Sequence, residues 1–305
     1  MQPITSLEGL ANHVRSLGRV TRIAVAAAED ANTLESLARA SSEGFVHGIL
    51  LGSKSKIESV CDELGLDSSG FEIINTENDA QAATQATQMV KEGQADVLMK
   101  GLVNTDVFLK AVLNKEKGLL PPKAVMSYVC ALELPKYHKL LFISDTAVLT
   151  NPDLNQKIAM VNYSVAMARR FGIEKPKAAL ISATEKVTPG LPNTLEYAQI
   201  SKMASRGQIK NCIVDGPLDV FLACDPAAAE IKGIESPIAG DADILVFPNL
   251  ESANSFYKGL MLWAGGELAG LIQGTLKPVV VMSRSESAAS KYYCVALSCL
   301  MAGEK

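Results

Sequence analysis

The stretch "KPVVVMSRSESAASKYY", residues 277–293, has the pattern of a buried strand that runs directly into a helix. Four apolar residues, Val279–Met282, are followed at once by Ser283 and Arg284, and small helix-forming residues come next. The start of a helix has unpaired backbone N–H groups and a partial positive charge. A strand that ends in a cation and opens onto a helix N-terminus therefore predicts a site for an anionic ligand.

Similar apolar runs recur along the chain. They are short and continuous rather than alternating, which predicts strands buried on both faces of a sheet. Segments with helical spacing lie between most of them, and several of these end in Gly. The strand-like runs occupy residues 22–28, 46–52, 71–75, 95–101, 125–132, 140–145, 178–183, 211–216, 242–248 and 278–283. This alternation of strands and helices predicts an α/β fold with mainly parallel sheets.

The number of strands favours two domains. Ten strands are many for one sheet of ordinary size, and 305 residues are enough for one large or two medium domains. The two strand-like runs within 125–145 have no helical segment between them. We therefore expect the domain boundary near this pair.

Composition excludes several classes of protein. A hydrophobic content of 48%, a charged content of 20% and a formal net charge of −4 indicate a well-packed globular chain. The acidic balance and the 5% aromatic content argue against a nucleic-acid binder, which uses a basic surface and stacking rings. No apolar run approaches the roughly 18 residues of a membrane span, and the first residues lack the pattern of a signal peptide. We expect a cytoplasmic protein that binds neither nucleic acid nor a membrane.

The cysteines and histidines do not predict a metal site. None of the six cysteines forms a C-x-x-C pair, so we interpret them as reduced core residues. The three histidines, His13, His47 and His138, are too scattered in sequence to suggest zinc ligands.

Polar side chains follow many of the predicted strands. In open α/β sheets ligands bind beyond the carboxyl ends of the strands, so these residues are the candidates for a binding site. Strand-end cations next to Gly, with Asn, Ser or Thr at helix starts, suit a phosphorylated or carboxylated ligand. The candidates are Lys100-Gly101 with Asn104 and Thr105, Ser144-Asp145-Thr146, residues 182–185, Asp215-Gly216-Pro217, residues 249–254, and Ser283-Arg284 with Glu286.

Each candidate also has a structural alternative. Asn104, Asp153 and Asn254 can cap helices. Asp145 and Asp215 can form turns, and Lys100 can be a solvated charge. Arg284 is harder to explain in this way, because a guanidinium directly after a buried strand is costly unless it is paired. Glu286 or another carboxylate can supply that pairing.

The common nucleotide and hydrolase motifs are absent from the sequence. It contains no G-x-x-x-x-G-K-[ST], no G-x-G-x-x-G after a strand and no G-x-S-x-G. This argues against ATP hydrolysis and against an ordinary nicotinamide-dependent enzyme.

Four blocks of sequence together resemble the phosphate acetyl/butyryltransferase family. They are "ADVLMKGLVNTDVFLKAVLNKEKGL", "VDGPLDV", "IESPIAGDADILVFPNLESANSFYKGL" and "AGLIQGTLKPVVVMSRSESAASK". The likeness runs in order from about residue 95 to the end, and the last two blocks are the most specific. The shorter phosphate butyryltransferase branch is the more similar one.

The resemblance implies a reversible reaction in which acyl-CoA and orthophosphate give acyl phosphate and free CoA. It implies that CoA and orthophosphate are substrates, that no cofactor is tightly bound, and that no metal or covalent intermediate takes part. It also implies two α/β/α domains of the isocitrate/isopropylmalate dehydrogenase-like fold with a cleft between them. By this likeness the first domain is discontinuous, comprising residues 1–135 plus 272–305, and residues 136–271 form the second. A homodimer or higher homo-oligomer, and metabolic coupling to an acyl kinase, are implied as well.

The same resemblance suggests roles for individual residues. Arg284 is expected to hold phosphate, Ser283 to hydrogen-bond the sulfur or the carbonyl oxygen, and Glu286 to take the thiol proton in the reverse direction. The acetyltransferase branch has an aspartate six residues beyond this arginine, where the present chain has Ser290, so the identity of the base stays open. The expected substrate-binding residues are Lys100, Gly101, Asn104, Thr105, Asp145, Asn254, Gln273 and Gly274, with Lys100 as a contact to the CoA pyrophosphate or to phosphate.

Two other functions remain open at this point. The first is a metal- and NAD-dependent decarboxylating 2-hydroxy-acid dehydrogenase of similar fold, which needs clustered aspartates and several arginines that are dispersed or scarce here. The second is a non-catalytic relative that only binds CoA or an acyl phosphate. The absence of the acetyltransferase-type aspartate at position 290 gives this alternative some weight. Butyryl is the preferred acyl group on resemblance, with acetyl or a branched acyl group as the alternatives. The sequence does not specify the acyl-chain length, the physiological direction or the number of subunits.

Overall fold

The computed structural model describes residues 3–282 and 286–303, and the chain divides into two compact units. The terminal unit comprises Leu7–Met126 and Leu268–Lys305, and the central unit comprises Met1–Ser6 and Ser127–Glu267. These limits differ from the predicted domains, 1–135 plus 272–305 and 136–271. The predicted division into folding domains stays a prediction.

The terminal unit contains a sheet in which five of the six strands are mutually parallel. Its strand order is β3-β2-β1-β4-β11-β10, and β10 pairs antiparallel with β11. The strands are β1 (Thr21–Ala26), β2 (Val46–Gly52), β3 (Glu72–Asn75), β4 (Val97–Lys100), β10 (Glu267–Gln273) and β11 (Val279–Val280). Apart from an exposed Arg22 and a half-buried His47, β1, β2 and β4 are buried along their whole length, as the continuous apolar runs predict.

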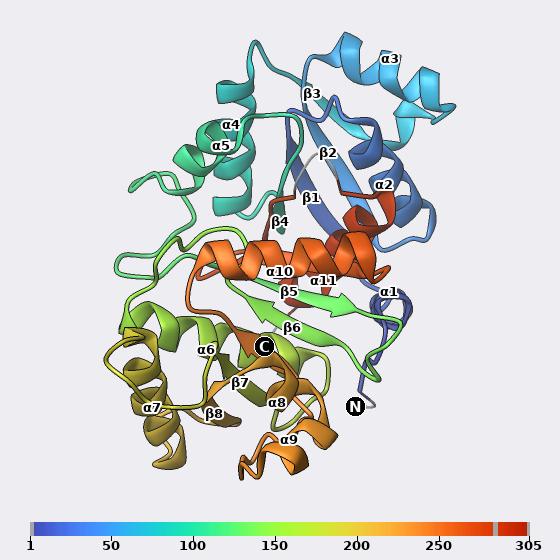
Figure 1. Ribbon diagram of the computed structural model, residues 1–305. Helices are drawn as coiled ribbons and strands as arrows, with labels where there is room; N and C mark the ends of the chain where they lie inside the picture. Colours follow the sequence, from blue (N-terminus) through green and yellow to red (C-terminus); the bar gives the residue numbers. More distant parts are fainter. Residues whose placement is uncertain (1–2, 283–285, 304–305) are drawn as a thin grey trace. The chain divides into compact units, whose positions relative to one another are not determined.

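Helices cover both faces of this sheet. Helix α2 packs against α11, and α11 against α1, whereas α4 packs against α5 and against β1, β2 and β4. Figure 1 shows α4 and α5 on the opposite side of β1 and β2 from α2. The helices are α1 (Leu7–Ser16), α2 (Ala31–Ser42), α3 (Lys54–Leu64), the short 3₁₀ turn η1 (Ser68–Gly70), α4 (Asp79–Lys91), α5 (Thr105–Val112) and α11 (Ala288–Ala302).

The central unit has a second run of strands in the order β5-β6-β9-β7-β8. Strands β5 and β6 pair antiparallel, and the others pair parallel. The strands are β5 (Ser127–Glu133), β6 (Leu141–Ser144), β7 (Lys177–Ile181), β8 (Ile213–Leu218) and β9 (Ile244–Val246). The helices are α6 (Leu154–Arg170), α7 (Pro192–Ser205), α8 (Val220–Cys224), α9 (Pro226–Lys232) and α10 (Leu250–Trp263).

The predicted α/β class with mainly parallel sheets is confirmed, and each predicted strand region contains a strand. The hairpin of β5 and β6 explains the missing helix between 125 and 145. One strand, β10, was not predicted. Within the part of the chain that the structure describes, no helix has the length and apolar content to cross a bilayer.

Capping explains some of the polar residues at helix starts. Asp153 forms a capping box with Gln156 at the start of α6, which confirms its structural alternative. Asn254 does not cap a helix, because it lies inside α10, where Asn249 is the capping residue. Turns and caps therefore account for Asp153 but not for Asn254.

A cluster of opposite charges joins the starting ends of three strands in the central unit. Lys139 contacts Asp241 and Asp243 at 2.8 Å each, and Lys177 contacts Asp241 at 3.0 Å. His138 also reaches Asp241 at 3.0 Å. Burial raises the pKa of Asp241, but the hydrogen bonds and charges of the two lysines outweigh it and lower that pKa to about 2.

We expect Asp241→Asn to lower the free energy of unfolding by about 1 kcal/mol at pH 7. The folded pKa lies below the unfolded value near 3.8, so the carboxylate stabilises the fold above that value and loses this effect as pH falls toward about 2. Solvent screening at this partly exposed carboxylate keeps the effect to about 1 kcal/mol. Urea unfolding at pH 7 and at pH 3 measures the difference, with the exposed Glu174→Gln as control. A difference that stays constant across this range would contradict the assignment.

Candidate active site at the carboxyl edge of the terminal unit

The carboxyl ends of β1, β4 and β11 lie at one edge of the terminal sheet. Ala26 of β1 is paired with Lys100 of β4, and Val280 of β11 with Met99. The connection from β11 to α11 leaves from this edge and contains Glu286, which is half-buried. Ser283 and Arg284, the predicted phosphate-binding pair, lie outside the described residues.

Gly101 is required by a close approach of two backbones. Its N–H donates to the Ala26 carbonyl at 2.9 Å, and the next N–H, of Leu102, donates to the Ala27 carbonyl at 2.7 Å. A Cβ atom at Gly101 would lie 2.0 Å from the Ala27 oxygen. Ala27 itself has a φ of 57°, in the left-handed region that a residue with a side chain seldom adopts. The ends of β1 and β4 are therefore locked together by backbone contacts that only glycine permits at position 101.

Lys100 is not a solvated charge. Its side chain is 7% exposed, and Nζ donates to the carbonyls of Gly101 at 3.1 Å and Val103 at 3.0 Å. The ammonium group therefore holds the loop that follows β4. Its expected contact with the CoA pyrophosphate or with phosphate stays a prediction.

Asn104 and Thr105 lie together at the exposed start of α5, on the same edge as Lys100. Asn104 occupies the N-cap position, but its side chain makes no cap hydrogen bond to the first turn. Capping therefore does not account for this asparagine, which keeps its predicted role in ligand binding as a candidate.

The start of α11 is anchored by residues that sequence reasoning did not single out. Lys291, 5% exposed, forms an ion pair with Asp30, which caps α2 through the Thr33 N–H. Burial raises the pKa of Asp30, but the hydrogen bonds and charge of Lys291 and Thr33 bring that pKa below its ordinary value. Ser287 caps α11 by accepting the Ser290 N–H at 3.0 Å. The ion pair of Lys291 and Asp30 fixes the starts of α11 and α2 side by side, next to the end of β1.

Ser290 stands where the acetyltransferase branch is expected to have its aspartate. Its side chain is fully buried in the first turn of α11. Glu286, four residues earlier, is the more accessible group and remains the candidate base.

Gln273 and Gly274 lie at the opposite end of the strands of the terminal sheet, away from the carboxyl ends of β1, β4 and β11. Ile272 of β10 pairs with Val279 at the beginning of β11, and the two strands run in opposite directions. The end of β10 is therefore at the edge where β4 and β11 begin. The structure does not bring these two residues together with Lys100, Gly101, Asn104 and Thr105.

The carboxylate of Asp145, in the central unit, is held by hydrogen bonds from within the protein. The carboxylate is 1% exposed and accepts four hydrogen bonds, from Ser127 Oγ and the Tyr128 N–H on one oxygen and from the Ala147 and Val148 N–H groups on the other. Burial raises its pKa above the ordinary value, although these hydrogen bonds act in the opposite direction. Both oxygens already have partners within the protein, so Asp145 orders the turn after β6, and its expected contact with substrate stays a prediction.

Asn254 also contacts this turn. Its Nδ2 donates to the Thr146 carbonyl at 2.9 Å from within α10. Asn254 therefore holds the same turn from the other side, and its expected contact with substrate stays a prediction.

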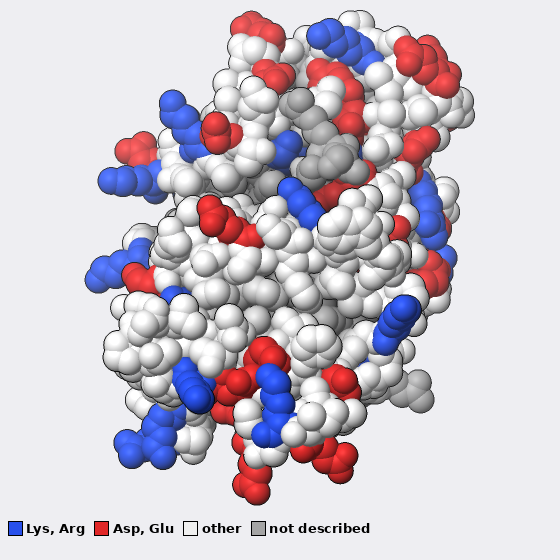
Figure 2. Space-filling view, viewed as in Figure 1, with Lys and Arg blue, Asp and Glu red and all other residues white. Residues whose placement is uncertain are grey.

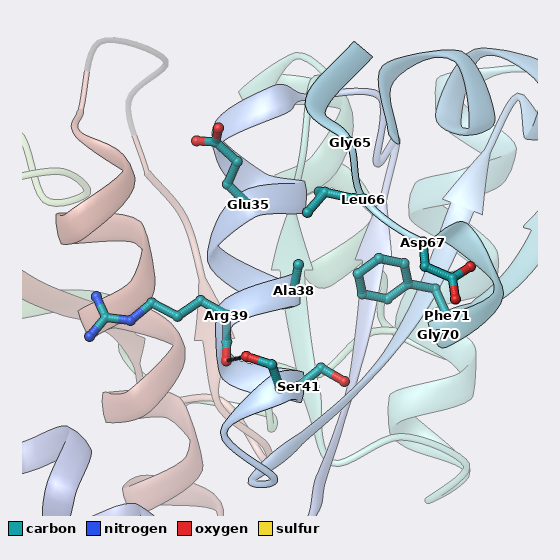
Figure 3. Close-up of a pocket in the computed structure, with 10 residues that line it drawn as sticks. Glu35, Ala38, Arg39, Ser41, Gly65, Leu66, Asp67, Gly70 and Phe71 are labelled. Carbon is teal, nitrogen blue, oxygen red and sulfur yellow. Dashed lines mark hydrogen bonds between the residues drawn. The ribbon is translucent and has the colours of Figure 1, made fainter. Parts of the chain in front are cut away.

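Of the cavities in the terminal unit, two lie at opposite ends of the strands of its sheet. The edge cavity, about 380 Å³, is lined at the carboxyl end by Glu29, Lys56, Ser59, Val60, Asp79 and Leu102. The other, about 540 Å³, lies between α2 and residues 65–71, beside the beginning of β3. Figure 3 shows the Phe71 ring facing Ala38 across this second cavity, while the Arg39 side chain extends away from it. Ligands in such sheets bind at carboxyl ends, which favours the edge cavity.

Charges on the visible surface are mixed in sign. On the described residues of the face shown in Figure 2, Lys and Arg side chains are interspersed with Asp and Glu side chains. Within residues 3–282 and 286–303, no group of three or more His, Cys, Asp or Glu side chains is arranged to hold a metal ion.

Comparison with known proteins matches residues 79–299 to the family model described as phosphate acetyl/butaryl transferase. The chain belongs to this family. It is 44% identical to a phosphate butyryltransferase of Clostridium acetobutylicum over 93% of the chain and 94% of that protein. It is 39% identical to a phosphate acetyltransferase of Thermotoga maritima, over 97% of the chain and 99% of that protein.

Solved structures agree with this assignment. A branched-chain phosphotransacylase from Enterococcus faecalis V583 superposes with a TM-score of 0.82 and 28% identity, covering 93% of this chain and all of that one. A 4-hydroxythreonine-4-phosphate dehydrogenase from Klebsiella pneumoniae is similar at a TM-score of 0.54 and 15% identity, over 93% of this chain and all of that one. That second likeness shows a shared dehydrogenase-like fold, as predicted, and gives no support to a dehydrogenase activity.

We expect Gly101→Ala to destabilise the protein by roughly 1–3 kcal/mol, the usual range for overpacking, because the new Cβ would overlap the Ala27 carbonyl. Gly70→Ala is the matched control, since a Cβ there meets nothing within 4 Å. Chemical denaturation of both variants measures the difference. Equal stability of the two would show that the ends of β1 and β4 tolerate separation.

Proposed function

We propose that the protein transfers a short-chain acyl group, preferably butyryl, between CoA and orthophosphate, giving acyl phosphate and free CoA. The observation that carries this proposal is the match to an acyltransferase family over residues 79–299, together with 44% identity to a phosphate butyryltransferase along 93% of the chain. The matched range includes the loop after β4 and the whole connection from β11 to α11. Acetyl is the alternative acyl group, since a phosphate acetyltransferase is 39% identical.

The proposed step is direct displacement in a ternary complex. A phosphate oxygen attacks the thioester carbonyl carbon, the C–O bond forms, the C–S bond breaks, and the CoA thiolate leaves and takes up a proton. Holding both substrates in line supplies several kcal/mol, up to about 7–11 in the best cases. Arg284 would hold phosphate, Ser283 would hydrogen-bond the carbonyl oxygen or the sulfur, and Glu286 would remove the thiol proton in the reverse direction.

The family resemblance also supports proposals for the substrates, the oligomeric state and a coupled enzyme. CoA and orthophosphate act as substrates without a tightly bound cofactor. The protein works as a homodimer or higher homo-oligomer, and an acyl kinase consumes or supplies the acyl phosphate.

A thiol-release assay tests the proposal. Butyryl-CoA is supplied with and without orthophosphate, and free CoA is measured. We expect release that depends on phosphate and needs neither NAD nor a divalent metal. Tight CoA binding without turnover would instead indicate a binding protein, and a metal- and NAD-dependent absorbance change with a 2-hydroxy acid would indicate a dehydrogenase.

The variant Arg284→Ala belongs in the same assay, with the exposed Arg206→Ala as control. Removing a donor to developing charge typically lowers kcat by about 10²–10³-fold, so a loss of this order is expected for Arg284 alone. Near-normal kinetics in Arg284→Ala would remove this residue from the mechanism.

A further inference from the structure

The edge cavity lies where the strand order of the terminal sheet reverses. From β1 the chain proceeds outward to β2 and β3, and it then returns to β4 on the other side of β1. Leu102 follows β4, Glu29 follows β1, and the remaining lining residues lie on α3 and at the start of α4. Such a reversal opens a crevice at the carboxyl ends of the strands, and ligands of α/β proteins bind there.

The carboxylate of Glu29 is held in a fixed place at this cavity. Its Oε1 accepts the Ser53 N–H at 2.7 Å. A Cβ at Gly52 would lie 2.7 Å from both carboxylate oxygens, so the absence of a side chain at Gly52 makes room for them. Glu29 therefore presents a positioned hydrogen-bond acceptor rather than a freely rotating charge.

The other lining residues combine three kinds of contact. Val60 and Leu102 provide apolar surface, Ser59 a hydroxyl group, and Lys56 a cation, while Asp79 adds a second carboxylate. Two carboxylates disfavour a ligand that consists only of phosphates. The carboxylates of Glu29 and Asp79 suit a ligand that also donates hydrogen bonds from an amino group and from hydroxyl groups. The Lys56 cation can then pair with a single phosphate. A volume of about 380 Å³ lies in the usual range for small-molecule sites.

We propose that the edge cavity binds the adenosine 3′-phosphate end of CoA. The purine lies against Val60 and Leu102, Glu29 accepts hydrogen bonds from the nucleoside, and Lys56 pairs with the 3′-phosphate. This inference rests on the proposed function only in taking acyl-CoA as the substrate. It assigns nucleotide recognition to α3 and to the ends of β1 and β4.

Substrates that lack parts of the nucleotide test the proposal. With butyryl-CoA, Lys56→Ala should raise KM about tenfold and leave kcat unchanged, because a charge-assisted contact with phosphate is lost. With butyryl-dephospho-CoA, which has no 3′-phosphate, and with S-butyryl-pantetheine, which has no nucleotide, Lys56→Ala should behave as the wild type. Lys54→Ala is the matched control, since Lys54 lies on the same helix outside the cavity and contacts Glu58.

A second variant fills the cavity. Ser59 is exposed on α3, so Ser59→Trp is expected to fold and to block the site. It should raise KM for butyryl-CoA and for butyryl-dephospho-CoA, but not for S-butyryl-pantetheine. Unchanged KM values for butyryl-CoA in both Lys56→Ala and Ser59→Trp would overturn the proposal and leave the acyltransferase function intact.

Calorimetric titration with CoA separates this proposal from the function itself. If the wild type shows no turnover, the proposed function fails, and the affinities of the same variants still decide the site. A Kd about tenfold weaker in Lys56→Ala than in Lys54→Ala supports the edge cavity, and equal Kd values overturn it.

Discussion

The backbone contact between Ala27 and Gly101 determines the geometry of the carboxyl edge of the terminal unit. Two hydrogen bonds tie the residues after β4 to the end of β1, and no side chain fits at position 101. With the strands held this close, the ammonium of Lys100 reaches the loop carbonyls of Gly101 and Val103. The loop that carries Leu102 toward the edge cavity is thereby fixed at both of its ends.

Buried charges have different roles in the two units. In the terminal unit Lys291 and Asp30 join the starts of α11 and α2, although they are 261 residues apart in sequence. In the central unit Asp145 is satisfied by its own turn and by β5. A buried charge costs several kcal/mol unless it is paired, so these contacts explain how Lys291 and Asp145 can be buried without requiring a ligand.

Much of the fold followed from the sequence because continuous apolar runs and helical spacing are local signals. Strand β10 was missed, although "ELAGLIQ" is largely apolar, because no helix separates it from β11. Its antiparallel direction places Gln273 and Gly274 at the opposite edge from Lys100, and direction is not a local property of a strand.

The site was predictable only in part. The rule that ligands bind beyond the carboxyl ends of strands selected Lys100, Gly101, Asn104 and Thr105. The structure brings these four residues together at the carboxyl ends of β1 and β4. The rule also selected Asp145, whose hydrogen-bond partners include Ser127 and Tyr128 from a neighbouring strand and were not evident from sequence. The edge cavity was missed because Lys56, Ser59 and Val60 lie on a helix face, and only packing against Glu29 and Leu102 makes that face part of a pocket.

A crystal structure of the protein with CoA would show directly where the nucleotide binds. We expect CoA at the carboxyl ends of the strands of the terminal sheet, with its nucleotide against Leu102 and α3. CoA bound instead between α2 and residues 65–71, at the opposite end of the sheet, would contradict it.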